Sequence, residues 1–386
     1  MITRNIQPVL LELSKTYPVV TITGPRQSGK TTLARMAFPD YTYCNLEHPD
    51  TRLFAQQDPN GFFLQHSPPL IIDEIQRLPG LMSYIQVDVD NRRQNGMYVL
   101  TGSQQLNLNA AITQSLAGRT ALLTLLPFSM EEVKKFALPD FTREKYIYTG
   151  FMPRIYDQQQ QPLIAYRNYL QTYVERDIRQ LLNLKDLNTF EKFMRLLAGR
   201  IGQVLNLNSL ANDTGVSATT IANWISVLEA SFVVFRLMPY FENFGKRVIK
   251  SPKLYFVEPG LASYLLGIEN DAQVARDPLL GSLFENLVIV EALKARFSQG
   301  KDPNFYFFRD SNQNEVDLLF KKDGELYPVE IKSAMTWNEG FQRNILRFNS
   351  IAGTQAKGCV VYGGKMHFQT SRNIRVTGFE DFTGLI

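Results

Sequence analysis

The sequence predicts an α/β fold that begins with a parallel sheet, continues through a helical segment and ends in an α+β tail. Between residues 1 and 128, four short apolar runs alternate with amphipathic stretches: Val19 to Thr23, Leu70 to Asp73, Met97 to Thr101 and Ala121 to Leu126. Short buried strands joined by helices are typical of parallel sheets. At 386 residues the chain is too long for one compact core, since domains commonly hold roughly 100–200 residues.

The composition indicates a chain that folds throughout. Hydrophobic residues make up 44% and charged residues 20%, as in ordinary globular proteins. No stretch approaches the ~18 apolar residues of a membrane span, and the first residues lack a signal peptide's pattern. We therefore expect a cytoplasmic protein with no membrane partner. Two cysteines and three scattered histidines exclude a disulfide framework and a zinc cluster, so we expect any metal ion to be held by oxygen.

A phosphate-binding loop follows the first predicted strand. Residues 24–31, GPRQSGKT, match the pattern G-x-x-x-x-G-K-[ST], and the amphipathic helix KTTLARMAF begins within them. Glycines allow backbone N–H groups to wrap a phosphate, while Lys30 reaches the β and γ oxygens and Thr31 coordinates Mg²⁺. The residues predicted to bind ATP and Mg²⁺ are Gly24, Pro25, Arg26, Gln27, Ser28, Gly29, Lys30, Thr31 and Thr32.

An acidic pair and a polar strand end complete the predicted nucleotide site. Asp73 and Glu74 follow the apolar residues of LIIDEI. We expect Asp73 to hold the Mg²⁺ shell and Glu74 to polarise the attacking water, which implies hydrolysis; an acidic pair that only ends a strand is the alternative. Ser103 ends another strand, where a sensor of the γ-phosphate would lie, although turn chemistry also explains Thr-Gly-Ser.

These motifs, together with SLAGRTALLTLLPFSMEE, GQVLNLNSLANDTGVS and KSPKLYFVEPGLA, resemble a family of bacterial and archaeal AAA-type ATPases. Its members join an AAA module to a C-terminal region described as a domain of unknown function. The resemblance covers nearly the whole chain and implies a ring-like homo-oligomer, in which an arginine of a neighbouring subunit completes the ATP site. Arg119 matches that arginine-finger position, with a surface arginine as the alternative. Arg154 lies where related ATPases place a second, cis-acting sensor that contacts the nucleotide.

Helical signals follow the predicted sheet. We expect a helical lid over residues 129–188, in which YLQTYVERDIRQLLNL is the clearest amphipathic run. Residues 189–277 are expected to form a winged-helix domain. The segment from Asn208 to Trp224 has the spacing of one helix, a turn at Gly215, an N-cap at Ser217 and a second helix.

A basic stretch follows that motif. From Arg236 to Lys253 five basic residues face one acidic residue, a local excess equal to the net charge of +4 of the whole chain. We predict that this stretch binds DNA phosphates. The predicted phosphate contacts are Lys246, Arg247, Lys250 and Lys253. The second helix, ATTIANWISVLEAS, has no Lys or Arg, so base-specific reading is not expected, and a winged helix used only for domain packing is the alternative.

Residues 278–386 contain a predicted hairpin with a charged face. Asp323-Gly324 is a preferred two-residue turn, so residues equally distant from it pair across the two strands. Asp317 then lies opposite Glu330, with Glu315 opposite Lys332 on the same face. Two opposed carboxylates are destabilising unless a cation or proton lies between them, and Mg²⁺ would remove the conflict; a charged face that is merely solvated is the alternative.

An Asp followed on the next strand by Glu-x-Lys also resembles the PD-(D/E)XK nuclease superfamily, which includes archaeal Holliday-junction resolvases. By that resemblance Asp317 and Glu330 bind metal, Lys332 positions or activates water, and Glu285 supplies a further acidic ligand. The predicted function is a Mg²⁺-dependent AAA-type ATPase that remodels or translocates structured or branched DNA and carries a nuclease-like tail. The alternative is a nucleotide-controlled switch that binds a protein partner through a non-catalytic tail.

Overall fold

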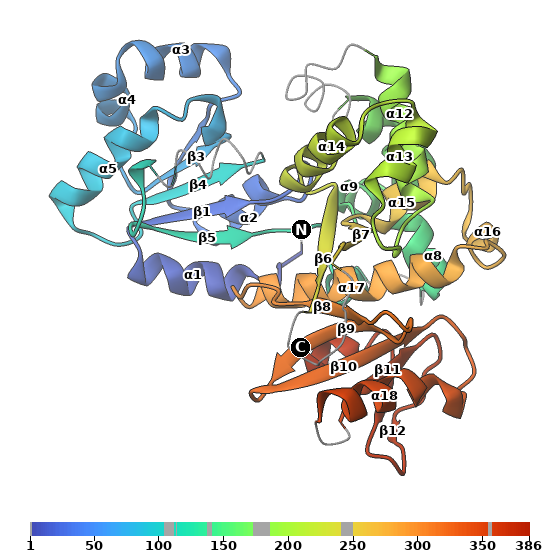
Figure 1. Ribbon diagram of the computed structural model, residues 1–386. Helices are drawn as coiled ribbons and strands as arrows, with labels where there is room; N and C mark the ends of the chain where they lie inside the picture. The colour runs from blue at the N-terminus through green and yellow to red at the C-terminus, as the bar shows by residue number, and fades with distance from the viewer. Residues whose placement is uncertain are drawn as a thin grey trace.

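Two β-sheets organise the molecule, as the computed structural model in Figure 1 shows. The structure describes residues 2–103, 112, 114–136, 141–172, 186–240, 250–353 and 357–386. A five-stranded parallel sheet lies towards the N-terminus, and a mixed eight-stranded sheet is built from the second half of the chain. The predicted α/β class is confirmed. Within the described residues, every helix is too short or too polar to cross a membrane.

The N-terminal sheet has the strand order β2-β3-β4-β1-β5. Four strands fall on the predicted apolar runs: β1 (Val19–Thr23), β3 (Leu70–Asp73), β4 (Tyr98–Gly102) and β5 (Thr120–Thr124). The edge strand β2 (Thr42–Asn45) was missed because Cys44 is its one buried side chain, so its sequence carries no apolar run. The surrounding elements are α1 (Gln7–Thr16), α2 (Lys30–Ala37), α3 (Pro49–Gln57), α4 (Pro59–Gln65), η1 (Ile75–Arg77) and α5 (Leu81–Arg92).

A largely helical segment follows the first sheet. Its first helices are α7 (Met130–Lys134), α8 (Arg143–Thr149), α9 (Pro153–Asp157) and α10 (Pro162–Tyr169). Most of the predicted amphipathic run over residues 169–184 lies outside the described residues. Further along are α12 (Leu187–Ala198), α13 (Leu207–Thr214), α14 (Ala218–Ala230), α15 (Pro259–Leu265) and α16 (Asp271–Val274).

The predicted helix-turn-helix is confirmed in its local geometry by α13 and α14. Gly215 ends α13 with φ of 86°, a left-handed conformation that favours glycine. Ser217 caps α14, because its hydroxyl accepts a hydrogen bond from the Thr220 backbone N–H. The antiparallel strands β6 (Val234–Pro239) and β7 (Lys253–Phe256) follow, in the position of a wing.

The second sheet has the order β12-β13-β11-β10-β9-β8-β6-β7. Its C-terminal strands are β8 (Tyr306–Arg309), β9 (Glu315–Lys322), β10 (Glu325–Lys332), β11 (Cys359–Tyr362), β12 (Phe368–Gln369) and β13 (Arg375–Gly378). Strand β6 pairs in parallel with β8, at Met238 and Tyr306, so the sheet continues across the boundary predicted at residue 277. A hydrophobic core running from Leu126 to Leu385 joins the lid, the middle segment (residues 189–277) and the tail (residues 278–386).

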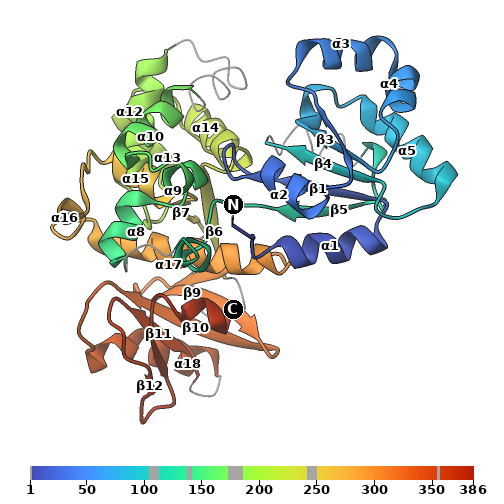
Figure 2. The ribbon, with the colours of Figure 1, turned by 180° about the vertical axis from the view of Figure 1, so that it is seen from behind.

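Helices cover the second sheet. Helix α17 (Leu280–Ser298) contacts β10 on one side and α8 and α15 on the other, and Figure 2 shows it between the sheet and those helices. The remaining helical elements are α18 (Arg343–Ala352), η3 (Glu339–Gln342) and η4 (Phe382–Leu385). Helix α18 packs on β9 and β10. The acidic hairpin is therefore part of a packed sandwich, and its charged face is not simply solvated.

The predicted hairpin register is confirmed for the five residue pairs nearest the turn. Asp323 and Gly324 form the turn with φ of 52° and 81°, as a two-residue turn between twisted strands requires. The pairs run from Glu325 with Lys322 to Val329 with Leu318, each pair equally distant from the turn.

Candidate functional site

The phosphate loop has the backbone shape that its glycines allow. Gly24 has φ of 144°, and a Cβ atom there would lie 2.1 Å from the carbonyl oxygen of Leu125. Gly29 has φ of 91° and is the N-cap of α2, so the chain turns sharply before the helix begins. The first N–H groups of α2 are consequently directed towards the space where a phosphate would bind.

Strand order brings the predicted magnesium residues together. Because β4 lies between β1 and β3, its carboxyl end is placed beside both the loop and Asp73. The Thr31 hydroxyl donates to the two Asp73 carboxylate oxygens, at 3.0 Å each. Tyr43 on β2 donates to the same carboxylate at 2.9 Å, and the Thr101 hydroxyl also contacts it. These groups offer oxygen ligands alone, which suits Mg²⁺, and Thr31 with Asp73 could hold it.

Glu74 is held in a fixed position beside the magnesium residues. It follows β3 with φ of 58°, and its backbone N–H donates to the Thr101 hydroxyl at 3.3 Å. The predicted sensor Ser103 is fully buried and donates to the Glu74 carboxylate at 3.3 Å. Gln76 contacts Glu74 and donates to Ser103 at 3.0 Å. Glu74, Gln76 and Ser103 therefore form one polar group able to orient a water molecule.

Lys30 is buried against the loop that it would serve. Its ammonium donates to the carbonyl oxygens of Gly24 at 3.0 Å and Pro25 at 2.7 Å. Burial lowers the pKa of Lys30 to about 8, although Glu74 and Asp73 oppose that shift. An incoming phosphate would replace the two carbonyl groups and favour the charged ammonium.

A pocket of about 680 Å³ joins the phosphate loop to the lid. Lys30, Thr31 and Glu74 line it, together with apolar side chains of the N-terminal segment, α2, the segment after β5 and the lid. Arg154 of α9 is exposed and lines the same pocket. Polar groups for phosphates and apolar side chains for a base together suit a nucleotide. The apolar lining residues are Ile2, Met36, Phe128, Phe136 and Pro153.

Arg119 lies away from the pocket of its own chain. Its carbonyl accepts a hydrogen bond from the Val19 N–H at the start of β1, whereas the phosphate loop follows the end of that strand. A five-residue strand spans roughly 17 Å. The Arg119 guanidinium forms a bidentate pair with Asp90, at 2.7 and 2.8 Å. Arg119 could therefore complete an ATP site only in a neighbouring subunit.

Arg4 is a residue of this site that sequence reasoning missed. Its guanidinium donates to the carbonyl oxygens of Ser28 and Leu126, at 2.7 Å each. It also forms a buried ion pair with Glu132 of α7, at 3.0 Å. Arg4 thus connects the phosphate loop to the start of the lid. No motif includes it, since its partners come from distant parts of the sequence.

The acidic residues of the tail have protein partners, although the Oε2 atom of Glu330 is buried with no hydrogen-bond partner in the part of the chain that the structure describes. The Asp317 carboxylate accepts from the Ile331 N–H at 2.8 Å, and Glu330 contacts Lys332 and accepts from Asn344 at 2.9 Å. Burial raises the pKa of Glu330 to about 8. Asp317 and Glu330 are almost inaccessible to solvent.

Glu285 also has protein partners, and its pKa is raised to about 7, chiefly by burial. Its carboxylate receives hydrogen bonds from Lys253, at 2.9 Å, and from Tyr255. No three acidic, histidine or cysteine side chains in the described part of the chain are arranged to hold a metal ion. The predicted metal residues Glu285, Asp317 and Glu330 therefore lie in one region, but their three carboxylates are not grouped as ligands around one point.

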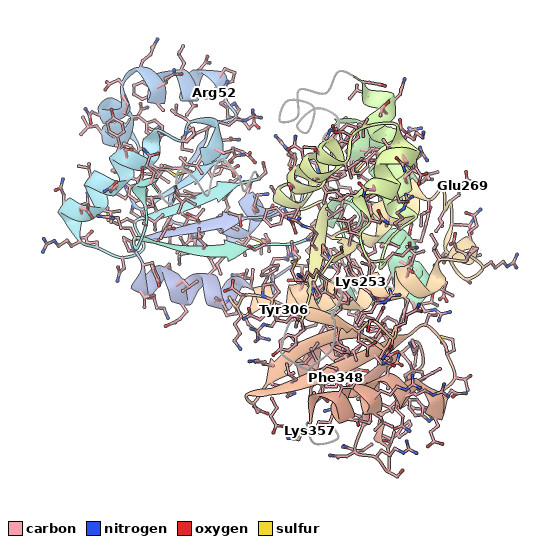
Figure 3. All side chains as sticks on the ribbon, viewed as in Figure 1. Arg52, Lys253, Glu269, Tyr306, Phe348 and Lys357 are labelled. Atoms are coloured by element: carbon pink, nitrogen blue, oxygen red, sulfur yellow. The ribbon has the colours of Figure 1, made fainter. Side chains whose placement is uncertain are left out.

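The prediction that Lys253 binds DNA is wrong. Lys253 is 2% exposed, and Figure 3 shows it inside the molecule, where the middle segment meets the second sheet. Its ammonium group forms ion pairs with the carboxylates of Glu285 and Glu315 in the tail. Arg236 forms an ion pair with Glu229. Of the other predicted contacts, Lys250 is exposed, while Lys246 and Arg247 lie outside the described residues.

Comparison with known proteins identifies three regions. Residues 16–134 match the family described as an AAA domain. Residues 141–272 and 280–382 match two domains of unknown function, DUF8612 and DUF4143. The uncharacterized protein Rv2008c of Mycobacterium tuberculosis is 32% identical over 364 residues, covering 92% of this chain and 79% of the relative. An uncharacterized protein of Haemophilus influenzae is 24% identical over 385 residues, covering 90% of each.

Solved structures show more distant likeness. The Walker-type ATPase PABY2304 of Pyrococcus abyssi is 14% identical with a TM-score of 0.45, covering 69% of this chain and 96% of that one. The Holliday junction branch migration motor RuvB of Thermotoga maritima is 18% identical with a TM-score of 0.34, covering 61% and 90%.

Proposed function

Because this chain belongs to the family of the M. tuberculosis protein, with an AAA domain ahead of two domains of unknown function, we propose that it is a Mg²⁺-dependent ATP hydrolase that acts on DNA. One observation carries the hydrolase assignment. Thr31 and Asp73 are in direct contact at the loop, and Glu74 lies beside them, held by Ser103. This arrangement supports the assignment, because it would place Mg²⁺ and a water-polarising carboxylate next to each other.

Each side chain then has a defined task. Lys30 leaves the Gly24 and Pro25 carbonyl groups and pairs with the β- and γ-phosphates, and the N–H groups of α2 bind the same oxygens. Thr31 and Asp73 would hold Mg²⁺, which would neutralise charge on the transferred phosphoryl group. Glu74 orients and polarises the attacking water, and its charge is kept in place by hydrogen bonds from neighbouring side chains.

The lid and a second subunit complete the proposed site. Arg154 enters the pocket from α9, so binding of the γ-phosphate would draw the lid towards the loop. Arg119 is too far from the loop of its own chain and would act on a neighbouring subunit, which implies a ring-like homo-oligomer. ATP turnover would then change both the lid angle and the contact between subunits.

Two substitutions test the hydrolase assignment. Lys30→Ala should abolish ATP binding, because the phosphates lose their one loop ammonium. Glu74→Gln should retain ATP binding and lower turnover by about a hundredfold or more, since it loses the negative charge that polarises water. Binding and steady-state phosphate release would be measured for both, with the exposed Lys15→Ala as control. Turnover at the normal rate in Glu74→Gln would refute the role of that carboxylate.

DNA is proposed as the substrate on narrower grounds. The α13–α14 pair has helix-turn-helix geometry, and α14 exposes Thr219, Asn223 and Ser226. These side chains can donate to phosphate oxygens and carry no charge. Lys250, in the basic stretch that follows α14, is also exposed. Contact would therefore be made mainly with the DNA backbone or its shape.

The DNA assignment is tested by turnover and by salt dependence. Single-stranded, duplex and four-way-junction DNA would each be added to the ATPase assay, with Glu74→Gln as the blank. Stimulation by one shape would identify the substrate. Combined neutralisation of Lys246, Arg247 and Lys250 should weaken DNA binding and reduce its salt dependence. Turnover that no DNA changes would favour the nucleotide-controlled switch with a protein partner.

Strand cleavage by the tail is left out of this proposal. The residues predicted to perform it, Asp317, Glu330 and Lys332, are engaged with protein groups, and Glu330 contacts Lys332 directly. A nuclease assay on linear and branched DNA, with Mg²⁺ or Mn²⁺, tests directly whether the tail cleaves DNA. Cutting that Asp317→Ala abolishes while ATP turnover persists would restore the nuclease prediction.

A further inference from the structure

A lysine lies within the acidic cluster of the second sheet. The Lys253 ammonium is 2.9 Å from a Glu285 carboxylate oxygen, 2.6 Å from Glu315 and 4.0 Å from Asp317. These acids come from α17 and β9, whereas the lysine comes from β7 at the far edge of the sheet. Three carboxylates therefore approach one ammonium group from different elements.

The backbone holds Lys253 in this position. Strand β7 pairs with β6 at Leu237, and a further bridge joins Lys253 to Val204. The side chain is 3% exposed, and the ammonium also lies 5.6 Å from the centre of the Phe307 ring. The lysine side chain is thus enclosed, and it could leave the cluster only if the strand moved.

The other partners of the cluster also come from the protein. Tyr255 donates to Glu285, and Arg309 is 3.3 Å from the second Glu315 oxygen. The Glu285 and Glu315 carboxylates lie within 2.9 Å of the ammonium, and such close negative charges favour its charged form.

A divalent ion cannot share this space. Mg²⁺ needs ligand oxygens at about 2.1 Å and several further oxygen ligands around it. Here the ammonium is already at hydrogen-bonding distance from two of the carboxylates, and its positive charge repels a second cation. Two of the acids that the nuclease resemblance assigns to metal, Glu285 and Asp317, thus have a cation supplied by the chain itself, and the third, Glu330, contacts Lys332.

We propose that Lys253 is the resident cation of the cluster formed by Glu285, Glu315 and Asp317 and takes the place of a divalent ion there, so that this cluster binds no metal. The carboxylates of Glu285, Glu315 and Asp317, which would otherwise repel one another, are held together by a side chain of the middle segment. The ion pairs thereby fasten the helix-turn-helix segment to the C-terminal sheet. On this ground the tail lacks the metal chemistry of phosphodiester cleavage.

The first test uses the wild-type protein. Mn²⁺ binding would be counted by electron paramagnetic resonance, without nucleotide, in the wild type and in Asp317→Asn. Asparagine keeps an oxygen that can accept the Ile331 N–H, so the hairpin should still form. Equal Mn²⁺ stoichiometry is expected, since the ATP site is the same in both proteins. An additional Mn²⁺ in the wild type that Asp317→Asn lacks would overturn the proposal.

The second test vacates the position. Lys253→Ala leaves three carboxylates facing an empty space, so we expect a lower melting temperature and a new Mn²⁺ site bound roughly tenfold or more tightly than any at this cluster in the wild type. Millimolar Mn²⁺ should then restore much of the lost melting temperature. A Lys253→Ala protein as stable as the wild type, or one that Mn²⁺ does not stabilise, would overturn the proposal.

Lys294→Ala is the matched control. Lys294 is also a buried lysine, 4% exposed, but its ammonium pairs with one carboxylate, Glu291, at 2.7 Å, and with the Phe128 carbonyl group. Its removal should lower the melting temperature without creating a divalent site, because a single carboxylate binds Mn²⁺ weakly. If Mn²⁺ stabilised Lys294→Ala as much as Lys253→Ala, the effect would be a general one and the proposal would fail. If Lys253→Ala does not fold, the comparison of wild type with Asp317→Asn decides.

Discussion

Arg4 connects the phosphate loop to the lid. Replacing it by methionine tests the polar part of that connection, because the apolar packing of the side chain is largely kept. The Arg4→Met change keeps an unbranched apolar side chain but removes the guanidinium. The main losses are the hydrogen bonds to the carbonyl oxygens of Ser28 and Leu126 and the ion pair with Glu132. A longer hydrogen bond to Pro127, from the nitrogen that also serves Leu126, and a cation–π contact with Phe128 are lost as well. The side chains of Arg4 and Glu132 are only 8% and 4% exposed, so water cannot replace these contacts without a local opening.

The expected loss of stability can be worked from these contacts. Breaking a buried ion pair by removing one partner costs about 3–5 kcal/mol. The lower end applies here, because Glu132 keeps hydrogen bonds from the Asn5 and Ser129 N–H groups. Each carbonyl group left without its donor adds ~1 kcal/mol. The sum is about 5 kcal/mol, which corresponds to a fall in melting temperature of about 10 °C.

Thermal unfolding followed by circular dichroism measures this fall, and ATP titration measures its effect on the loop. Arg4→Met/Glu132→Gln should recover about 2 kcal/mol, since it no longer leaves a buried charge unpaired. Lys15→Met is the control, because the pair between Lys15 and Glu12 is about 70% exposed on both sides and should shift the melting temperature by about 1 °C at most. A melting temperature of Arg4→Met within about 3 °C of the wild type would refute the reasoning.

Three further predictions concern the loop, the hairpin and the core. Burial lowers the Lys30 pKa to about 8, and a bound phosphate raises it again, so ATP binding takes up a proton above pH 8. The affinity for ATP should therefore fall up to about tenfold per pH unit from pH 8 to 10. Calorimetry in two buffers would measure both the affinity and the proton uptake. Gly24→Ala should cost about 3 kcal/mol and abolish ATP binding, because its Cβ would lie 2.1 Å from the Leu125 oxygen, whereas Gly324→Ala, in open space, should cost about 1 kcal/mol in denaturant melts. Burial raises the Glu258 pKa above its usual 4.5, so the folded state favours the protonated carboxyl group and stability should fall as the pH rises from 4.5. Thermal melts at several pH values would measure this fall, and Glu258→Gln should make it smaller.

Much of the first half of the chain could be predicted from the sequence because its signals are local. Apolar runs bounded by polar residues located four strands of the first sheet, and the spacing of Gly24, Gly29 and Lys30 located the phosphate loop. The strand β2 escaped prediction because an edge strand with one buried side chain has no pattern that distinguishes it from a loop. Strand order, which places Ser103 beside Glu74, has no local signal at all.

The hairpin shows the same limit within a few residues. Its register followed from the Asp323-Gly324 turn, because the turn fixes which residues pair. The sequence also predicted the acidic face of the hairpin and the repulsion between its opposed carboxylates. The sequence suggested Mg²⁺ as the cation, but the cations present are Lys332 beside Glu330 and Lys253, which the fold brings to 4.0 Å from Asp317 although it lies some sixty residues earlier in the chain.

By itself, then, the sequence determined the α/β class, the nucleotide-binding loop, the helix-turn-helix and the hairpin register, because each depends on residues near one another in the chain. Only the tertiary structure decided which charges are available. A count of basic residues weighed Lys250 and Lys253 equally, yet one is exposed and the other is 2% exposed among carboxylates. The contacts of Arg4 were likewise decided by folding, because its partner Leu126 lies 122 residues away. Burial and ion pairing arise from packing between distant segments, and packing has no signature in any short stretch of sequence.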